Sequence, residues 1–195
     1  FILVYVKKKS KSTYRKKPYL RNFFVVGTLF GFGFYLSGIF WVAYSLTFDE
    51  SFKILIPFAI ILIPLFLSIF TGLTTIAVGQ FLSYNFSSIL LFSGFFSLAD
   101  YVRGKILSGF PWNLWSYSWS WLNEALQVLN LVGLYAYNLL VITIFMLPAV
   151  LFFNIRLNKK ILITSLTFLF IFLIYIYGTF SINKNKAVLN YINDN

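Results

Sequence analysis

The chain has 195 residues, of which 59% are hydrophobic and 11% charged, and its mean hydropathy is +0.82. Globular domains carry about a quarter charged residues, so a water-soluble core of this size could not bury so much apolar surface. The net charge of +11 does not indicate a nucleic-acid-binding protein, because eight of the sixteen Lys and Arg residues lie between Lys7 and Arg21. Basic residues that cluster between long apolar runs are typical of loops beside a membrane.

Neither Cys nor His is present. This excludes a thiolate nucleophile, an imidazole base and the usual zinc ligands within these residues. We expect no metal site and no cofactor, and no nucleic-acid partner.

The first residues, 1–6, are apolar and precede the basic run, which is the reverse of the order in a secretory signal. We therefore predict that 1–6 is the end of a preceding transmembrane helix. Residues 7–21 are then a basic cytoplasmic loop.

Long uncharged stretches follow this loop. A helix rises ~1.5 Å per residue and needs about 20 residues to cross the hydrocarbon core. The longest stretch, Ile54 to Ala99, is too long for one crossing, and polar turn residues from Gly79 to Asn85 divide it. We therefore predict an all-α, polytopic membrane bundle within residues 22–183, with about five transmembrane helices. They are expected near residues 22–47, 54–78, 86–102, 125–154 and 161–181.

Alternation of these helices across the membrane predicts which loops face the cytoplasm. With 7–21 inside, the loops assigned to the inside hold eleven basic and no acidic residues, and the outside segments hold all five acidic residues. Cytoplasmic loops collect Lys and Arg, so the count favours this orientation. The inner turn from Gly79 to Asn85 carries no charge and does not contribute to this count.

The tryptophans favour the same orientation. Four of them lie in one outer segment, and Trp41 lies in the outer half of its helix. Tryptophan is enriched where a membrane meets water.

The helix expected over 22–47 contains four glycines, at positions 27, 31, 33 and 38. A dinucleotide-binding loop would require Gly at Leu36, so that interpretation is excluded. The spacing of Gly27 and Gly31 instead predicts a small-xxx-small contact that lets two helix backbones approach closely.

The segment from Leu98 to Trp119 brings charge close to the membrane. Asp100 and Arg103 are three residues apart, so on a helix they share a face and can pair. Two roles stay open for the pair, a structural ion pair that reaches the headgroups and a contact to substrate.

Pro111 breaks the helix in this segment. Beyond it, Trp112, Trp115 and Trp119 recur at helical spacing, which predicts a short interfacial helix with its aromatic side toward lipid. A break of this kind could also form the wall of a lateral opening through which an acyl chain enters.

Three blocks of the sequence resemble the transmembrane part of bacterial apolipoprotein N-acyltransferase. The blocks are GTLFGFGFYLSGIFWVAYSL from Gly27 to Leu46, LADYVRGKILSGFPWNLWSYSW from Leu98 to Trp119, and LQVLNLVGLYAYNLLV from Leu126 to Val141. The resemblance implies an inner-membrane enzyme with eight crossings and a nitrilase-like domain facing the periplasm. Such enzymes transfer an acyl chain from a phospholipid donor to the N-terminal amine of a diacylglyceryl-cysteine lipoprotein acceptor, through a thioester on an enzyme cysteine. A thioester conserves acyl-transfer potential between two lipid substrates that are bound in turn.

The resemblance also implies which residues matter here. The family's catalytic Glu, Lys and Cys belong to the nitrilase-like domain, so we expect no catalytic residue in this chain. It is expected to be a fragment comprising roughly the third to seventh crossings, with 184–195 as a periplasmic linker toward that domain. Family members often have Glu where Asp100 stands. The residues expected to shape a lipid-access region are Asp100, Arg103, Pro111, Trp112 and Tyr117.

Two other classes of protein are compatible with the composition. One is a non-enzymatic membrane transport subunit that binds a small ligand, and the other is a membrane scaffold or assembly factor. Against transport, no charged residue lies deep in an expected span and no inverted repeat is visible.

Overall fold

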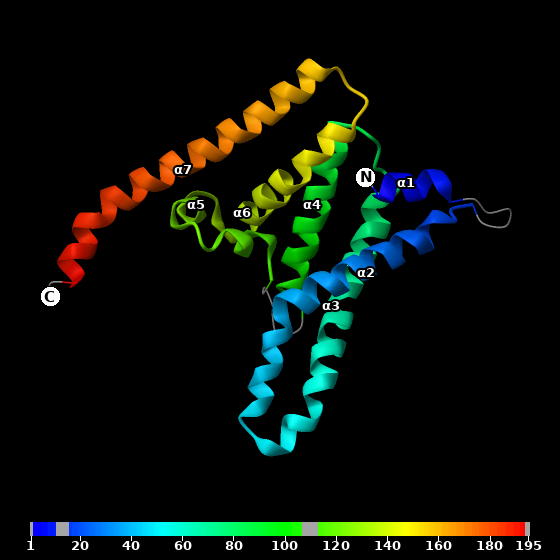
Figure 1. Cartoon of the computed structure of the whole chain (residues 1–195), viewed down its shortest axis with the longest axis horizontal. Helices are drawn as coiled ribbons and strands as arrows, with labels where there is room; N and C mark the ends of the chain where they lie inside the picture. The colour runs from blue at the N-terminus through cyan, green and yellow to red at the C-terminus, as the bar shows by residue number, and fades with distance from the viewer. Residues whose placement is uncertain (1, 11–15, 107–112, 194–195) are drawn as a thin grey trace. The chain divides into compact units, whose positions relative to one another are not determined.

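A computed structural model describes residues 2–10, 16–106 and 113–193. It divides into two compact units, Phe1–Asn113 and Leu114–Asn195, and each is described by itself. The regular elements of the described residues are all helical (Figure 1), which confirms the expected all-α membrane fold.

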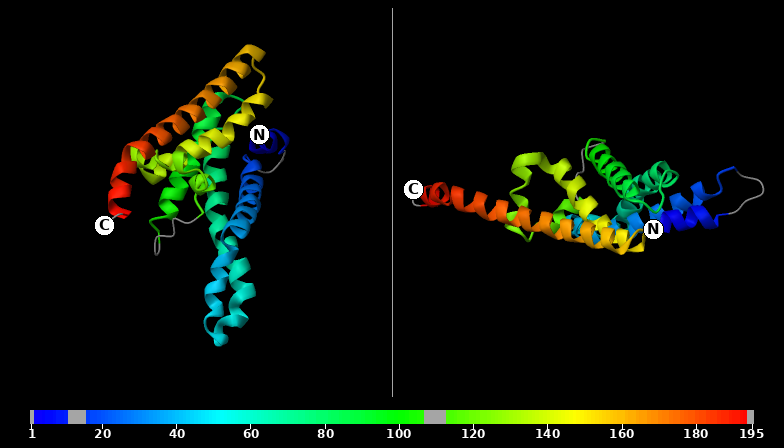
Figure 2. Two further views of the ribbon diagram at one scale, coloured as in Figure 1. Left: turned by 60° about the vertical axis from the view of Figure 1, so that its left-hand side comes forward. Right: turned by 90° about the horizontal axis from the view of Figure 1, so that it is seen from above.

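The first unit is built around a helical hairpin. Its elements are α1 (Ile2–Lys9), α2 (Tyr19–Ile39), the 3₁₀ segments η1 (Phe40–Thr47) and η2 (Glu50–Leu55), α3 (Ile56–Gly79) and α4 (Phe86–Arg103). The chain runs through α2 and η1, turns at Asp49, and returns antiparallel through η2 and α3 (Figures 1 and 2). Helices α1 and α4 pack against this hairpin.

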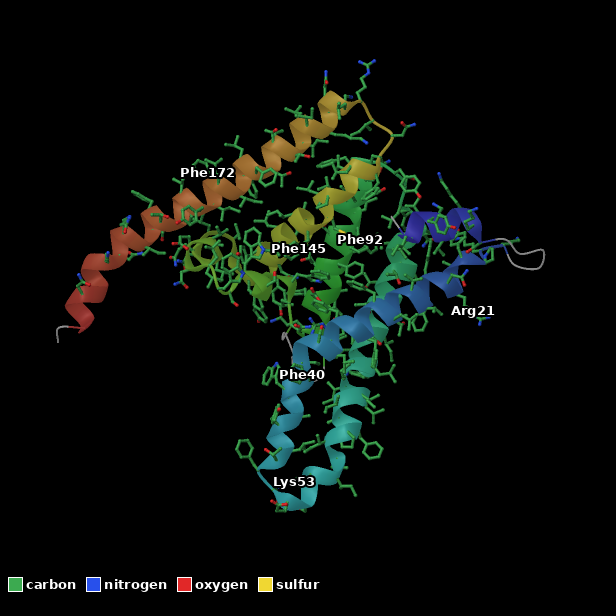
Figure 3. All side chains as sticks on the ribbon, in the orientation of Figure 1. Arg21, Phe40, Lys53, Phe92, Phe145 and Phe172 are labelled. Carbon is green, nitrogen blue, oxygen red and sulfur yellow. The ribbon has the colours of Figure 1, made fainter. Side chains whose placement is uncertain are left out.

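Asp49 forms the hairpin tip. Its carboxylate accepts hydrogen bonds from the hydroxyl and the backbone N–H of Ser51, which cap η2, and these two bonds lower the pKa of Asp49. Lys53 lies at the same tip, while Arg21 is at the opposite end of the hairpin (Figure 3). Asp49 and Glu50 are both exposed at this tip.

Small residues bring α2 and α3 into close contact. Gly27 is buried, and a Cβ built on it would lie 2.8 Å from the carbonyl oxygen of Thr71. The Thr71 hydroxyl donates to the carbonyl of Gly27 at 3.0 Å, and the Thr75 hydroxyl donates to the carbonyl of Phe23 at 2.8 Å. A Cβ on Gly31 would likewise collide with the Thr71 side chain. The backbone of α2 thus lies close enough to α3 to accept hydrogen bonds from its side chains.

The described residues contain four helical stretches that are long and apolar enough to cross a membrane. They are Tyr19–Thr47, Glu50–Gly79, Leu129–Phe152 and Leu157–Lys186. The helix expected over 86–102 is present as α4, but it is not among the four. It has 18 residues, and four serines with the Asp100 and Arg103 pair lower its hydropathy.

The second unit is described by five elements. They are η3 (Trp115–Trp119), α5 (Asn123–Leu126), α6 (Leu129–Met146), η4 (Leu147–Phe152) and α7 (Leu157–Asn193). Gly133 interrupts α6 with φ 75° and ψ 171°, a conformation that only glycine adopts without strain. The stretch expected as one helix over 125–154 is therefore several shorter segments.

Helix α7 continues to Asn193, so the described residues from 184 onward are helical. Its Gly178 lies against the backbone of Glu124 in α5, where a side chain would not fit. Buried residues of α5, α6 and α7, with Val128 between α5 and α6, form the core of this unit, and they are Ala125, Val128, Tyr137, Val141 and Ile174.

The α2–α3 contact predicts unequal effects of alanine at two glycines of the same helix. Gly27→Ala should lower the free energy of unfolding by about 1–3 kcal/mol, because the new methyl group meets the backbone of α3. Gly33→Ala is the control, since its Cβ would have no atom within 4 Å, and it should be neutral or slightly stabilising. Thermal unfolding of the full chain in detergent micelles measures both. Equal stabilities of the two variants would contradict the close contact between the backbones of α2 and α3.

Candidate functional site

A buried ion pair closes the carboxyl end of α4. Arg103 Nη2 lies 3.1 Å from Asp100 Oδ1, and the two side chains are 2% and 10% exposed. The pair expected from the spacing is therefore present, and it is buried within its unit instead of reaching outward. Burial of either charge alone would be costly, so the two groups stabilise each other.

Tyr35 joins this pair from helix α2. Its ring is 1% exposed, and the guanidinium carbon of Arg103 lies 5.2 Å from the ring centroid. At that distance the cation is attracted by the ring face, and the attraction is greater where water is excluded. Arg103 thus links the end of α4 to the carboxyl-terminal part of α2.

Asn113, which follows the segment 104–112 in the sequence, contacts the same part of α2. Its side-chain Nδ2 donates to the carbonyl of Phe34 at 3.2 Å. Gly38 leaves the space that the Asn113 side chain occupies, because a Cβ on this glycine would collide with the amide. Asn113 has a φ of 57°, a left-handed conformation that asparagine tolerates better than most residues.

The two ends of the segment 104–112 are therefore fixed on neighbouring turns of one helix. Arg103 precedes the segment and contacts Tyr35, and Asn113 follows it and contacts Phe34 and Gly38. Residues 107–112, which include Pro111 and Trp112, lie outside the described residues. The structure defines the contacts that Arg103 and Asn113, on either side of this segment, make with α2.

Tyr117 belongs to the second unit, in η3. Its side chain is 41% exposed, and the neighbouring Ser116 backbone N–H donates to Asn138 Oδ1 at 3.0 Å. Asn138 is fully buried in α6 and so holds η3 on that helix.

Two of the tryptophans expected to face lipid, Trp115 and Trp119, lie within the described residues, in the short 3₁₀ segment η3. Trp115 and Trp119 pack with Phe145 of α6, and their ring centroids lie 6.0 and 6.5 Å from that of Phe145. Both are half-buried against the core of the second unit. A 3₁₀ turn with an anchoring Asn138 presents them to α6, which helical periodicity alone did not anticipate.

Sequence reasoning missed Tyr35, Asn113 and Asn138. Asn138 is the polar residue between Tyr137 and Leu139 in an apolar run, and that contrast was a usable signal. Tyr35 carries no such signal among 13 tyrosines, because its role depends on a contact with a residue far along the chain.

The buried pair predicts a stability difference between two ion pairs of the same spacing. Arg103→Ala leaves Asp100 buried without its partner and should lower the free energy of unfolding by about 3–5 kcal/mol. Lys53→Ala removes the Glu50–Lys53 pair, whose side chains are 87% and 46% exposed, and should cost about 0–1 kcal/mol. Thermal unfolding in detergent distinguishes the two, and similar losses would contradict the difference in burial.

Comparison with known proteins identifies the family. Residues 12–147 match the model of the apolipoprotein N-acyltransferase N-terminal domain. Relatives named apolipoprotein N-acyltransferase include one from Rhizobium etli, 34% identical over 127 residues, or 65% of this chain and 24% of the relative. Another, from Rickettsia typhi, is 31% identical over 162 residues, or 83% of this chain and 32% of the relative. No solved structure matches the chain.

The matched region contains most of the first unit and reaches into α6 of the second. The chain spans about a quarter of the length of the curated relatives that it matches first, 24% for the one from Rhizobium etli. Nothing in these comparisons favours a transport subunit. With its apolar helices, the chain is a bacterial membrane protein. It belongs to the apolipoprotein N-acyltransferase N-terminal domain family.

Proposed function

We propose that this chain forms the membrane part of an enzyme that N-acylates lipoproteins. The acyl chain would come from a phospholipid and be transferred to the N-terminal amine of a diacylglyceryl-cysteine lipoprotein. The observation that carries the proposal is the family match over residues 12–147, together with the relatives' shared name. The chain contains no cysteine, so a thioester intermediate would form on a residue outside it.

In this proposal the segment 104–112 shapes the route by which lipid reaches the enzyme. Arg103 and Asn113, on either side of the segment, both contact α2. Asp100 supports Arg103, and Pro111, Trp112 and Tyr117 would line the route.

The proposed location is the bacterial inner membrane, with the basic segment 7–21 in the cytoplasm and the tryptophan-bearing segment on the periplasmic side. Two hydrogen bonds support this orientation. Lys7 Nζ donates to the carbonyl of Gln80 at 2.6 Å, and Lys17 Nζ donates to Gln80 Oε1 at 3.2 Å. The uncharged turn 79–85 therefore lies beside the basic segment and shares its positive environment.

A complementation experiment tests the proposed activity. The complete reading frame that contains this chain is expressed in a bacterium depleted of its own apolipoprotein N-acyltransferase. We expect growth to recover and the N-terminal peptides of lipoproteins to gain one amide-linked acyl group, measured by mass spectrometry. The control is the same frame with a stop codon at Tyr19. Normal amounts of protein in the membrane without N-acylation would contradict the proposal.

The proposed lipid route predicts a kinetic effect at Trp112. In the complete protein, Trp112→Ala should slow formation of the acyl-enzyme thioester in vesicles by about 10- to 100-fold, because misplacement of a substrate is costly. Trp121→Ala is a matched control, since Trp121 is 77% exposed and belongs to the second unit. Membrane insertion of both variants should be normal. Thioester formation at the unchanged rate in the Trp112 variant would remove this residue from the proposed route.

A further inference from the structure

Lysine side chains converge on the turn between α3 and α4. Lys7 Nζ donates to the carbonyl oxygens of Gln80 and Leu82, at 2.6 and 3.4 Å. Lys17 Nζ donates to the side chain of Gln80 at 3.2 Å, and Lys8 Nζ lies 4.7 Å above the centroid of the Tyr84 ring. We call these three lysines with Gln80 and Tyr84 the basic face.

The carboxyl end of α3 holds this face together. The last carbonyl groups of a helix carry partial negative charge and have no partner within the helix. Gln80 is the residue that follows α3, and Lys7 donates to its carbonyl oxygen and to that of Leu82, in the turn beyond the helix. The lysines are therefore fixed by contacts to the turn and are not free to spread over the surface.

Carboxylates are remote from the basic face in the described part of the first unit. Asp49 and Glu50 lie at the hairpin tip, at the end opposite Arg21 (Figure 3). Asp100 lies in the last turn of α4 and pairs with Arg103. The turn 80–85 precedes the first residue of α4, so Asp100 is at the far end of that helix from the basic face. The positive charge of the face thus has no neutralising acid beside it among these residues.

The face also lies at the boundary of the apolar helices. One membrane-spanning stretch begins at Tyr19 and the next ends at Gly79. Tyr84 and the half-buried Tyr19 border this end of the hairpin, and tyrosine is enriched where a membrane meets water. Lys8 and Lys17 are exposed here, and basic residues beside the end of a membrane-spanning helix are suited to contact lipid headgroups.

We propose that the basic face binds the phosphodiester headgroup of an anionic phospholipid. Lysine ammonium groups bind phosphate as point charges, and basic pockets between transmembrane helices on the cytoplasmic side are suited to acidic headgroups. Lys8 and Lys17 contact the phosphodiester, while Lys7 fixes the turn. This binding is separate from acyl transfer and does not depend on the proposed enzyme activity.

Lipid retention by the full chain tests the proposal. The chain is purified in a mild detergent and offered equal amounts of phosphatidylglycerol and phosphatidylcholine, and bound lipid is measured by native mass spectrometry. We expect preferential retention of phosphatidylglycerol. The double variant K8Q/K17Q should weaken it by roughly 10-fold or more, because each lysine near an anionic surface contributes about fivefold to binding. The variant K8R/K17R keeps the charge and should retain the lipid.

The control is K159Q/K160Q, which removes two lysines from another basic stretch. The control removes the same charge as K8Q/K17Q, and Lys160, like Lys17, makes a hydrogen bond within the protein, to the carbonyl of Leu151 at 2.7 Å. It should change retention less than twofold. Equal losses in the two glutamine variants would show diffuse attraction and overturn the proposal. So would unchanged retention in K8Q/K17Q, loss of binding in K8R/K17R, or displacement of the lipid by millimolar inorganic phosphate.

Discussion

Polar groups inside an apolar bundle need partners within the protein, because hydrocarbon supplies none. In the first unit this requirement is met mainly where α2 and α3 touch. Gly27 and Gly31 let the two backbones approach, and the hydroxyls of Thr71 and Thr75 then reach carbonyls of the neighbouring helix. The remaining features of the unit, its buried ion pair and its basic face, are attached to the two helices that this contact joins.

The anchored loop shows how the helix pair serves the site. Tyr35, Phe34 and Gly38 lie on α2 just beyond the glycine contact, and they receive Arg103 and Asn113 from the two sides of the loop. A shift of α2 against α3 would therefore move both anchors together. In the proposed function this region belongs to the route for lipid, and Arg103 and Asn113 provide two contacts between it and α2.

Much of this architecture could be predicted from the sequence, because hydropathy and charge act locally. The uncharged runs predicted the helices α2, α3 and α4, and the three-residue spacing of Asp100 and Arg103 predicted their pairing. Contacts between distant residues could not be read in this way. The spacing of Arg103 says nothing of Tyr35, which lies 68 positions earlier by residue number. The break at Gly133 was also missed, since an apolar run gives the same signal whether or not one glycine leaves the helical conformation.

The hairpin has a consequence for how the protein is made. The hydroxyls of Thr71 and Thr75 bond to carbonyls only 44 and 52 positions earlier in the chain. Every partner in this contact has been synthesised by the time Gly79 is added, before α4 exists. Two helices that satisfy each other can enter the lipid phase as one unit during translation, and later segments then assemble on a platform that is already folded.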